Sequence, residues 1–271
     1  MPSLFGVRLS PRGLMEAPGI RNLGDSFLLR SLRGKDLGRF RGKFPTRQAA
    51  VASLPPSAAT EYDDESLVGV NLESFSQIHP FDWPVLALCQ WLMREGRMKV
   101  MTDFGGHVGV KYYAFEPMLD PAKELTWQVV DVPAMIREGR RRLSPENKSL
   151  TFYETLEQTQ PCDALLLSGV VQYSDRSIEE IVASLPKKPY IIFLNKVPVS
   201  DKGGYFTIEK YIKPLAYRIY GRSELEATRE RMGYHRLAQW PIPHRDIITL
   251  NGTSMDQVHM LGEAWCLEEL K

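Results

Sequence analysis

The stretch VMTDFGGHVGVKYY, residues 100–113, holds one acid, three glycines and a histidine within seven positions. A glycine turn between a strand and a helix is a common cradle for a nucleotide cofactor, because glycine permits close approach and dihedrals that a Cβ forbids. The dinucleotide pattern GxGxxG fails in both registers, since His107 and Val108 occupy positions that require glycine, and no Gly-Lys-Ser/Thr P-loop follows. The remaining pattern, acid-x-Gly-x-x-x-Gly, is that of a cofactor loop or of a turn without ligand.

A second acid, Asp131, follows Gly109 by 22 residues, at the end of the next expected strand. A carboxylate at that place can accept both ribose hydroxyls of a nucleoside. The alternative is that Asp131 only caps the following helix.

The elements that must position these residues alternate from about residue 85 onward. Short apolar runs predict five buried strands, at 97–104, 125–132, 149–154, 162–171 and 189–197. Helical patterns are found at 82–96, 134–143, 177–185 and 223–234, and two further strands at 235–241 and 258–270. Such alternation predicts a parallel sheet with helices on both faces and a C-terminal hairpin at one edge.

The chain divides into three expected regions: a basic extension at 1–40, a mainly helical cap at 41–96 and a cofactor-binding domain at 97–271. Residues 1–48 contain ten Lys or Arg and only three acids, which indicates a solvated arm, a partner-binding arm or a lid over an anionic substrate.

Composition excludes several classes of protein. The 271 residues are 43% hydrophobic and 25% charged with net charge +1, so we expect no nucleic-acid partner. No apolar run approaches the ~20 residues that span a bilayer, so we expect no membrane association. Three widely separated cysteines favour a reducing cytoplasm, and the scattered histidines and acids predict no metal site.

The loop and Asp131 resemble motifs I and II of class I S-adenosylmethionine (SAM)-dependent methyltransferases. The chain further resembles a family of bacterial stand-alone methyltransferases whose motif I reads DFGGHVG, often encoded among polysaccharide or secondary-metabolite genes. The shared segments, in order, are FRGKFPTRQAAVASLP, EYDDES, HPFDWPVLALCQWL, DFGGHVGVKYYAF, WQVVDVPAMIREG, LLLSGVVQY and LNKVPVS. The resemblance covers the chain from about Arg41 onward. One departure is Lys196, where the family often has the arginine of Arg-Thr-Pro.

The resemblance implies a Rossmann-like α/β fold with a mostly parallel seven-stranded sheet and an antiparallel C-terminal edge strand. It also implies SAM as cofactor. The residues expected to bind the cofactor are Asp103, Phe104, Gly105, Gly106, His107, Gly109, Asp131, Val132, Glu154, Thr155, Ser168 and Gly169. Among these, Glu154 and Thr155 could equally be an exposed loop pair, and His107 is expected to hydrogen-bond the cofactor or the cap.

The acceptor is expected near Gln172, Tyr173, Lys196 and Tyr113, although packing under the cap is an equal reading for Gln172 and Tyr173. Candidate catalytic residues are His244 and Tyr173, with a solvated loop histidine as the alternative for His244. SGVVQY is not a nucleophile elbow, because Leu166 and Val170 stand where GxSxG needs glycine.

The sequence therefore predicts a SAM-dependent methyltransferase that acts on oxygen or nitrogen of a small-molecule acceptor. Two alternatives remain open. One is a non-catalytic scaffold that docks a partner through its basic arm, and the other is an enzyme that uses the same cofactor for different chemistry. A homodimer is left open as the assembly.

Overall fold

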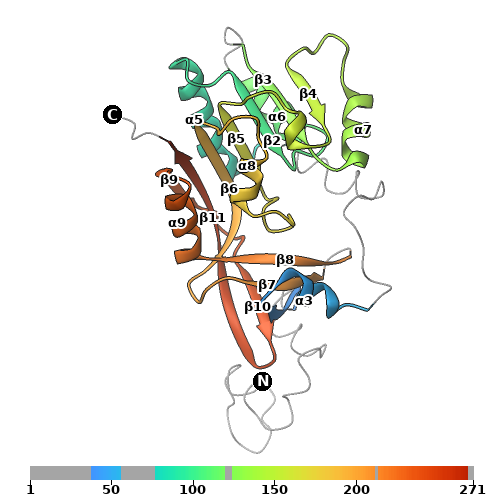
Figure 1. Cartoon of the computed structure of the whole chain (residues 1–271), viewed down its shortest axis with the longest axis vertical. Coiled ribbons are helices and arrows are strands. Elements are labelled where there is room, and N and C mark those ends of the chain that lie inside the picture. The colour runs from blue at the N-terminus through green and yellow to red at the C-terminus, as the bar shows by residue number, and fades with distance from the viewer. Residues whose placement is uncertain (1–37, 56–76, 120–123, 211–212, 268–271) are drawn as a thin grey trace, which may run out of the picture.

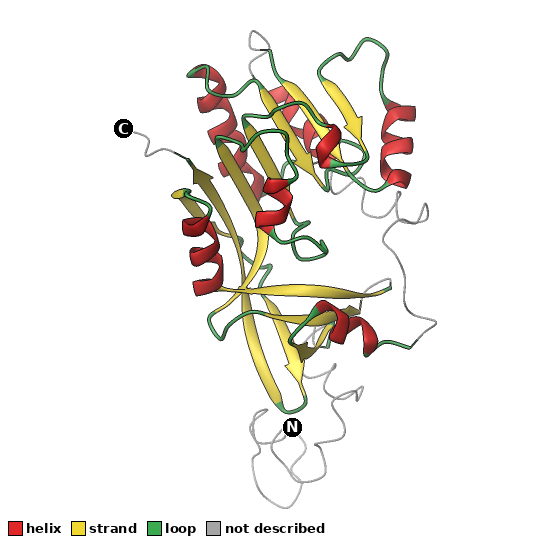
Figure 2. Cartoon of the chain, viewed as in Figure 1, coloured by secondary structure: helices red, strands yellow, loops and turns green. Residues whose placement is uncertain are grey.

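The computed structural model describes residues 38–55, 77–119, 124–210 and 213–267, and every structural statement below concerns these residues. Nearly all of the expected basic extension, and the acidic turn at 61–66, lie outside them. Figures 1 and 2 show an elongated α/β molecule with helices around its upper strands.

The centre of the molecule is a parallel sheet formed by β2 (Val100–Phe104), β3 (Thr126–Val130), β4 (Leu150–Tyr153), β5 (Ala164–Ser168) and β6 (Ile191–Ser200). These strands lie in the order β4-β3-β2-β5-β6. The order reverses between β2 and β5, which places a topological switch point at their carboxyl ends.

Two further strands complete the expected seven. β11 (Ser254–Cys266) pairs antiparallel with β6, and β9 (His235–Pro241) pairs antiparallel with β11. The mostly parallel seven-stranded sheet is thus confirmed. The antiparallel C-terminal strand, however, lies one place in from the edge, because β9 forms the outer strand.

Helices cover both faces of this sheet, as expected. Alternate residues of β5 belong to different clusters: Leu166 packs with α5 (Trp83–Arg94) and α6 (Val110–Phe115), whereas Leu165 and Leu167 pack with α8 (Ile178–Ala183) and α9 (Arg222–Arg231). α7 (Pro133–Arg142) adds the buried Ile136 to the first cluster. Since successive strand residues face opposite sides, continuously apolar strands are what a sheet covered on both faces requires.

A second group of strands, called the hairpin group below, was not predicted from the sequence. It comprises β1 (Phe40–Phe44), β7 (Tyr205–Lys210), β8 (Pro214–Gly221), β10 (Ile247–Asn251) and the amino-terminal half of β11, in the order β8-β7-β1-β10-β11. β7 and β8 form an antiparallel hairpin that crosses below the parallel strands (Figure 1). α3 (Arg47–Ala52) packs on this hairpin through Ala50. The two groups together make one sheet of eleven strands among the described residues.

Short 3-10 turns join several elements: η3 (Pro80–Asp82) precedes α5, η4 (Glu116–Met118) follows α6, and η5 (Leu156–Gln158) follows β4. No helix in the described ranges has the length and apolar character to cross a bilayer.

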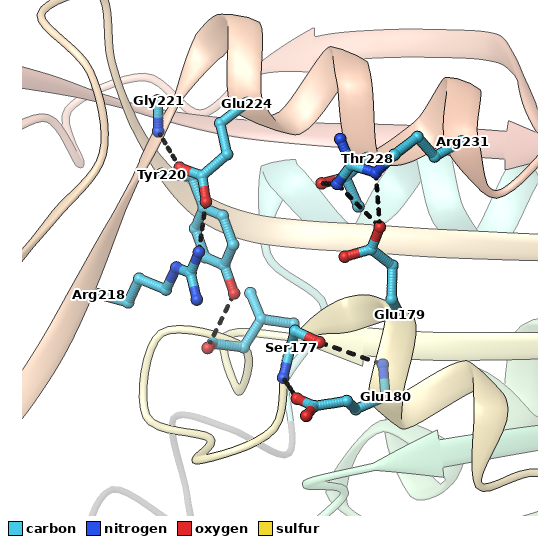
Figure 3. A network of polar contacts seen from close by, with 10 residues as sticks. Ser177, Glu179, Glu180, Arg218, Tyr220, Gly221, Glu224, Thr228 and Arg231 are labelled. Carbon is cyan, nitrogen blue, oxygen red and sulfur yellow. Dashed lines mark hydrogen bonds and ion pairs between the residues drawn. The ribbon is translucent and has the colours of Figure 1, made fainter. Parts of the chain in front are cut away.

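Polar contacts fasten the segment after β5 to the hairpin. The amide of Arg218 donates to the Gln172 carbonyl at 2.8 Å, and the Tyr220 hydroxyl donates to the Val171 carbonyl at 3.1 Å. Figure 3 shows the Tyr220 contact together with the pairing of Arg231 and Glu179 at 2.8 Å, which joins α9 to α8. The segment after β5, at the switch point, is therefore held to β8 of the hairpin.

Candidate functional site

The glycine turn after β2 adopts a conformation that depends on glycine. Gly105 (φ +74°) and Gly109 (φ +86°) have left-handed backbone, and so does His107 at φ +57°. Glycine takes this conformation without penalty, whereas for a residue with a Cβ it is uncommon. At Gly106 a Cβ would lie 2.7 Å from the Asp103 carboxyl carbon, so only glycine permits this close approach. The turn wraps its backbone around the end of β2.

Asp103 is a buried carboxyl at that point, with 1% of its surface exposed. Its Oδ2 accepts a hydrogen bond from Trp127 Nε1 at 3.2 Å. Burial and, to a smaller extent, the nearby charge of Asp131 raise the pKa of Asp103 to about 7, against the opposing effects of Trp127, Lys111 and Lys196. A cation placed beside this carboxyl would stabilise its ionised form and lower its pKa.

Asp131 lies just beyond the neighbouring strand, β3, and contacts the glycine turn. Its Oδ2 accepts from the His107 amide at 2.7 Å and its Oδ1 from the Val132 amide at 2.7 Å. The residue at the N-cap of α7 is Val132, not Asp131. Because each carboxylate oxygen has two lone pairs, these bonds leave further acceptor capacity. Asp131 thus joins the turn to the end of β3.

The turn after β5 lies on the other side of the switch point. Gly169 (φ +73°) donates its amide to the Asn195 carbonyl at 2.8 Å. Val170 packs against the first glycine turn, since a Cβ on Gly105 would meet its Cγ2 at 2.4 Å. The side chain of Lys196 packs against Gly169 in the same way, since a Cβ on Gly169 would lie 2.8 Å from its Cε.

A buried polar network, which the sequence did not predict, lies behind these turns. Lys111 Nζ contacts Asp82 Oδ2 at 2.6 Å, and both side chains are buried. Asn195 Nδ2 donates to Asp82 Oδ1 at 3.2 Å, and Trp240 Nε1 donates to Asn195 Oδ1 at 3.3 Å. The network links η3, α6, β6 and β9. In the sequence, the only local indication of this network is the HPFDWP segment, whose residue pattern is typical of the start of a helix.

The structure brings some of the predicted site residues together and separates others. Asp103, the glycine turn, Asp131, Gly169 and Lys196 surround the switch point. Ser168, at the end of β5, accepts from Asn195 Nδ2 at 3.5 Å. Phe104 and Val132 are half-buried at the ends of their segments.

Glu154, Thr155, Tyr113 and His244 are exposed. Glu154 and Thr155 follow β4, the strand next to β3, and Tyr113 lies on α6. His244 has left-handed backbone at φ +61° in the turn between β9 and β10.

Tyr173 and Gln172 lie with the hairpin group. The Tyr173 hydroxyl donates to Glu209 Oε2 at 2.6 Å, and Arg39 contacts the other oxygen of this buried carboxylate at 2.6 Å. The ring of Tyr173 meets that of Tyr217 edge-on at 5.1 Å. The described residues contain no cluster of three or more His, Cys, Asp or Glu that could hold a metal ion.

Comparison with known proteins gives likeness of fold only. No family model matches the chain, and no curated protein matches it. The PH0226 protein of Pyrococcus horikoshii is 10% identical with a TM-score of 0.48, over 76% of this chain and 99% of that one. An O-methyltransferase family protein of Burkholderia thailandensis is 11% identical with a TM-score of 0.48, over 83% of this chain and 64% of that one.

A third structure, 1,6-didemethyltoxoflavin-N1-methyltransferase of Burkholderia thailandensis with bound S-adenosylhomocysteine, is 14% identical with a TM-score of 0.43, over 73% and 86% of the two chains. Similarity at this level does not carry a function from one chain to another.

Proposed function

We propose that this protein is a SAM-dependent methyltransferase that acts on an oxygen or nitrogen atom of a small-molecule acceptor. The observation that carries the proposal is the convergence of two carboxylates, Asp103 and Asp131, on one glycine turn at the switch point. In open parallel sheets ligands bind at this place, and a cationic nucleoside suits both carboxylates.

The residues present fit such a cofactor. In this proposal Asp103 and the turn Gly105–Gly109 hold its methionine end, and Asp131 accepts from the two ribose hydroxyls. Val132 lies against the adenine, with Glu154 and Thr155 at the adenine edge. Phe104 and His107 contribute to cofactor binding as part of the segment that forms the turn. Ser168 and Gly169 lie where acceptor and cofactor meet.

When bound, the cofactor supplies the electrophile, a methyl group on a positively charged sulfur. The protein must then align the acceptor atom in line with that bond and exclude water, which is worth several orders of magnitude in rate. A general base is required only for an acceptor that loses a proton. Two residues are candidates for that base. The Tyr173 hydroxyl is hydrogen-bonded to Glu209, and His244 is exposed to solvent, so these contacts favour neither residue over the other.

Calorimetric titration with SAM and S-adenosylhomocysteine tests the proposal. We expect both to bind the wild-type chain, and we expect Asp131→Ala to lose about 1–3 kcal/mol of binding free energy through unpaired ribose hydroxyls. Glu146→Ala is the matched control, because this exposed acid precedes β4 at the opposite end of the strands.

Two results would reject the proposal. One is that neither compound binds at up to ~1 mM, the range of weak ligands. The other is that Asp131→Ala and Glu146→Ala have the same affinity as the wild type. A cytoplasmic location is part of the proposal, supported by three cysteines that are free and buried.

A further inference from the structure

The carboxylate of Asp82 is a buried link between the two turns at the switch point. Its Oδ2 contacts Lys111 Nζ at 2.6 Å, and its Oδ1 accepts from Asn195 Nδ2 at 3.2 Å. Only 1% of the Asp82 surface is exposed. Asp82 lies in η3, before α5, and therefore in the region that the sequence assigns to the cap and not to the cofactor-binding domain.

Lys111 connects this carboxylate to the glycine turn. It is the second residue of α6, and Gly109, the last glycine of the turn, is the N-cap of that helix. The Tyr113 amide donates to the Gly109 carbonyl at 3.1 Å, and the Gly109 amide donates to the Gly106 carbonyl at 3.0 Å. A displacement of the start of α6 therefore displaces the turn.

Asn195 connects the same carboxylate to the turn after β5. Its main-chain carbonyl accepts the Gly169 amide at 2.8 Å, and its Nδ2 lies 3.5 Å from Ser168 Oγ. Its Oδ1 accepts from Trp240 Nε1 at 3.3 Å, which fixes the orientation of the side-chain amide. The position of Asn195 therefore sets the position of Gly169.

The Asp82 carboxylate is itself held in place. Its Oδ2 accepts a second hydrogen bond, from the His79 amide at 3.0 Å, and the Asp82 amide donates to the His79 carbonyl at 2.8 Å. Pro80 and Pro84, on either side of Asp82, restrict the backbone torsions of this segment. A carboxylate fixed in this way can determine the distance between its two partners.

Stability alone does not account for an ion pair in this position. Taking both charges out of water offsets most of their attraction, and apolar side chains of similar volume often give the same stability or more. The ion pair adds direction, because charge-assisted hydrogen bonds are short and specific in geometry. Side chains behind a binding site that fix its geometry in this way determine how well it binds.

We propose that Asp82 is a positioning residue of the cofactor site, which sets the spacing of the glycine turn and the turn after β5 through Lys111 and Asn195. The inference rests on the proposed function, because the nucleoside is expected to bind at these turns. Asp82 acts through its two partners and not by contact with the nucleoside. The cofactor site then includes η3.

The double variant Asp82→Asn/Lys111→Met tests the inference, because it removes the ion pair without leaving an unpaired charge and without changing the net charge. The matched control is Asp256→Asn/Lys43→Met. Asp256 is also 1% exposed and contacts Lys43 Nζ at 3.0 Å. The hydrogen-bonding partners of Asp256 lie in β1, β6 and β7, so the control removes a buried ion pair at another place in the fold.

Calorimetric titration with S-adenosylhomocysteine and urea denaturation are carried out on the wild type and both double variants. We expect Asp82→Asn/Lys111→Met to raise the Kd about tenfold and the control to leave it within about twofold, since the loss of an outer support costs about tenfold or more at metal sites. This difference should hold whichever variant loses more stability. An ion pair with a structural role alone would leave the affinity of the folded chain unchanged in both variants.

Amide hydrogen exchange without ligand gives a second readout at the turns themselves. The reporters are the amides of Gly109 and Gly169, which donate to the Gly106 and Asn195 carbonyls. In Asp82→Asn/Lys111→Met we expect both amides to exchange about tenfold faster, because the turns open locally at a lower free energy. In the control we expect both rates to stay within about twofold of the wild type.

Trp240→Phe serves as a second variant if Asp82→Asn/Lys111→Met does not fold. It removes only the bond to Asn195 Oδ1. We expect it to speed exchange at Gly169 and not at Gly109.

Three results overturn the inference: unchanged exchange at both glycines, a Kd within twofold of the wild type in the Asp82 variant, or effects of equal size in the control. Failure of the wild type to bind S-adenosylhomocysteine would reject the proposed function instead. Hydrogen exchange then still decides whether Asp82 positions the two turns.

Discussion

Asp103 is the residue whose ionisation links stability to the proposed function. Burial raises its pKa to about 7, so the folded chain retains this proton over a pH range in which the unfolded chain loses it. Stability from this group is fully present below about pH 4 and is lost as pH rises to about 7. At higher pH the folded chain keeps a buried charge near Asp131.

The isosteric change Asp103→Asn removes that charge. We expect the stability of the variant relative to the wild type to rise as pH increases from 4 to 7, and to reach a gain of about 4 kcal/mol at pH 8. We expect its affinity for SAM at pH 8 to fall by about tenfold or more, because a charged partner is lost. Thermal unfolding across pH and calorimetry measure the two effects. A stability difference independent of pH would contradict the assigned pKa.

Local spacing made the proximity of the glycine turn and Asp131 predictable. The glycine turn and Asp131 are defined by their positions along two consecutive strands, and carboxyl ends of neighbouring parallel strands meet at one edge. Asp82, Asn195 and Trp240 could not be found in this way. They come from three separate segments and meet only after the sheet and its helices have packed.

At the scale of elements, the two turns at the switch point pack directly on each other. A Cβ on Gly105 would overlap Val170, and its φ of +74° adds backbone strain. Gly105→Ala should therefore destabilise the protein by about 2–4 kcal/mol. Gly96→Ala is the matched control. Gly96 has φ +69° with nothing within 4 Å of the added Cβ, so strain alone should cost about 1 kcal/mol.

Urea denaturation of both variants separates the two causes. If Gly105→Ala and Gly96→Ala lose the same free energy of unfolding, Val170 accommodates the added Cβ without loss of stability. That result would contradict the close packing of the two turns.

The buried pair of Asp82 and Lys111 joins η3 to α6. Lys111→Met leaves the Asp82 charge buried beside Asn195 and should cost about 3–5 kcal/mol, whereas the double variant Asp82→Asn/Lys111→Met should recover much of that loss. Denaturant unfolding of the three chains provides the measurement. The surface pair of Glu138 and Arg141 is the comparison, where Glu138→Gln should leave the denaturation midpoint almost unchanged. A double variant less stable than Lys111→Met would contradict this account of the pair.

At the scale of the whole molecule, the segment after β5 connects the proposed active site to the hairpin group. The Tyr173 hydroxyl contacts Glu209, which Arg39 also holds. We expect Tyr173→Phe to lower the free energy of unfolding by about 1 kcal/mol without changing nucleoside affinity. Urea denaturation and calorimetry test this. A large loss of nucleoside affinity with unchanged stability would contradict this structural role of Tyr173.

The five parallel strands of the central sheet were predictable because each is a short run rich in apolar residues. The hairpin group was not. β1 is five residues long, carries Gly42 at φ +78°, and pairs with Ile208 and Leu250, which lie far along the chain. No periodicity within such a segment reports a partner so distant in sequence, and the same is true of β10.

A crystal structure of the full chain grown with S-adenosylhomocysteine tests the central claim most directly. We expect the nucleoside between the Gly105–Gly109 turn and the end of β3, with both ribose hydroxyls donating to the Asp131 carboxylate. The amino group should lie against Asp103. A nucleoside bound elsewhere, or a site at the switch point that stays closed at saturating ligand, would contradict the claim.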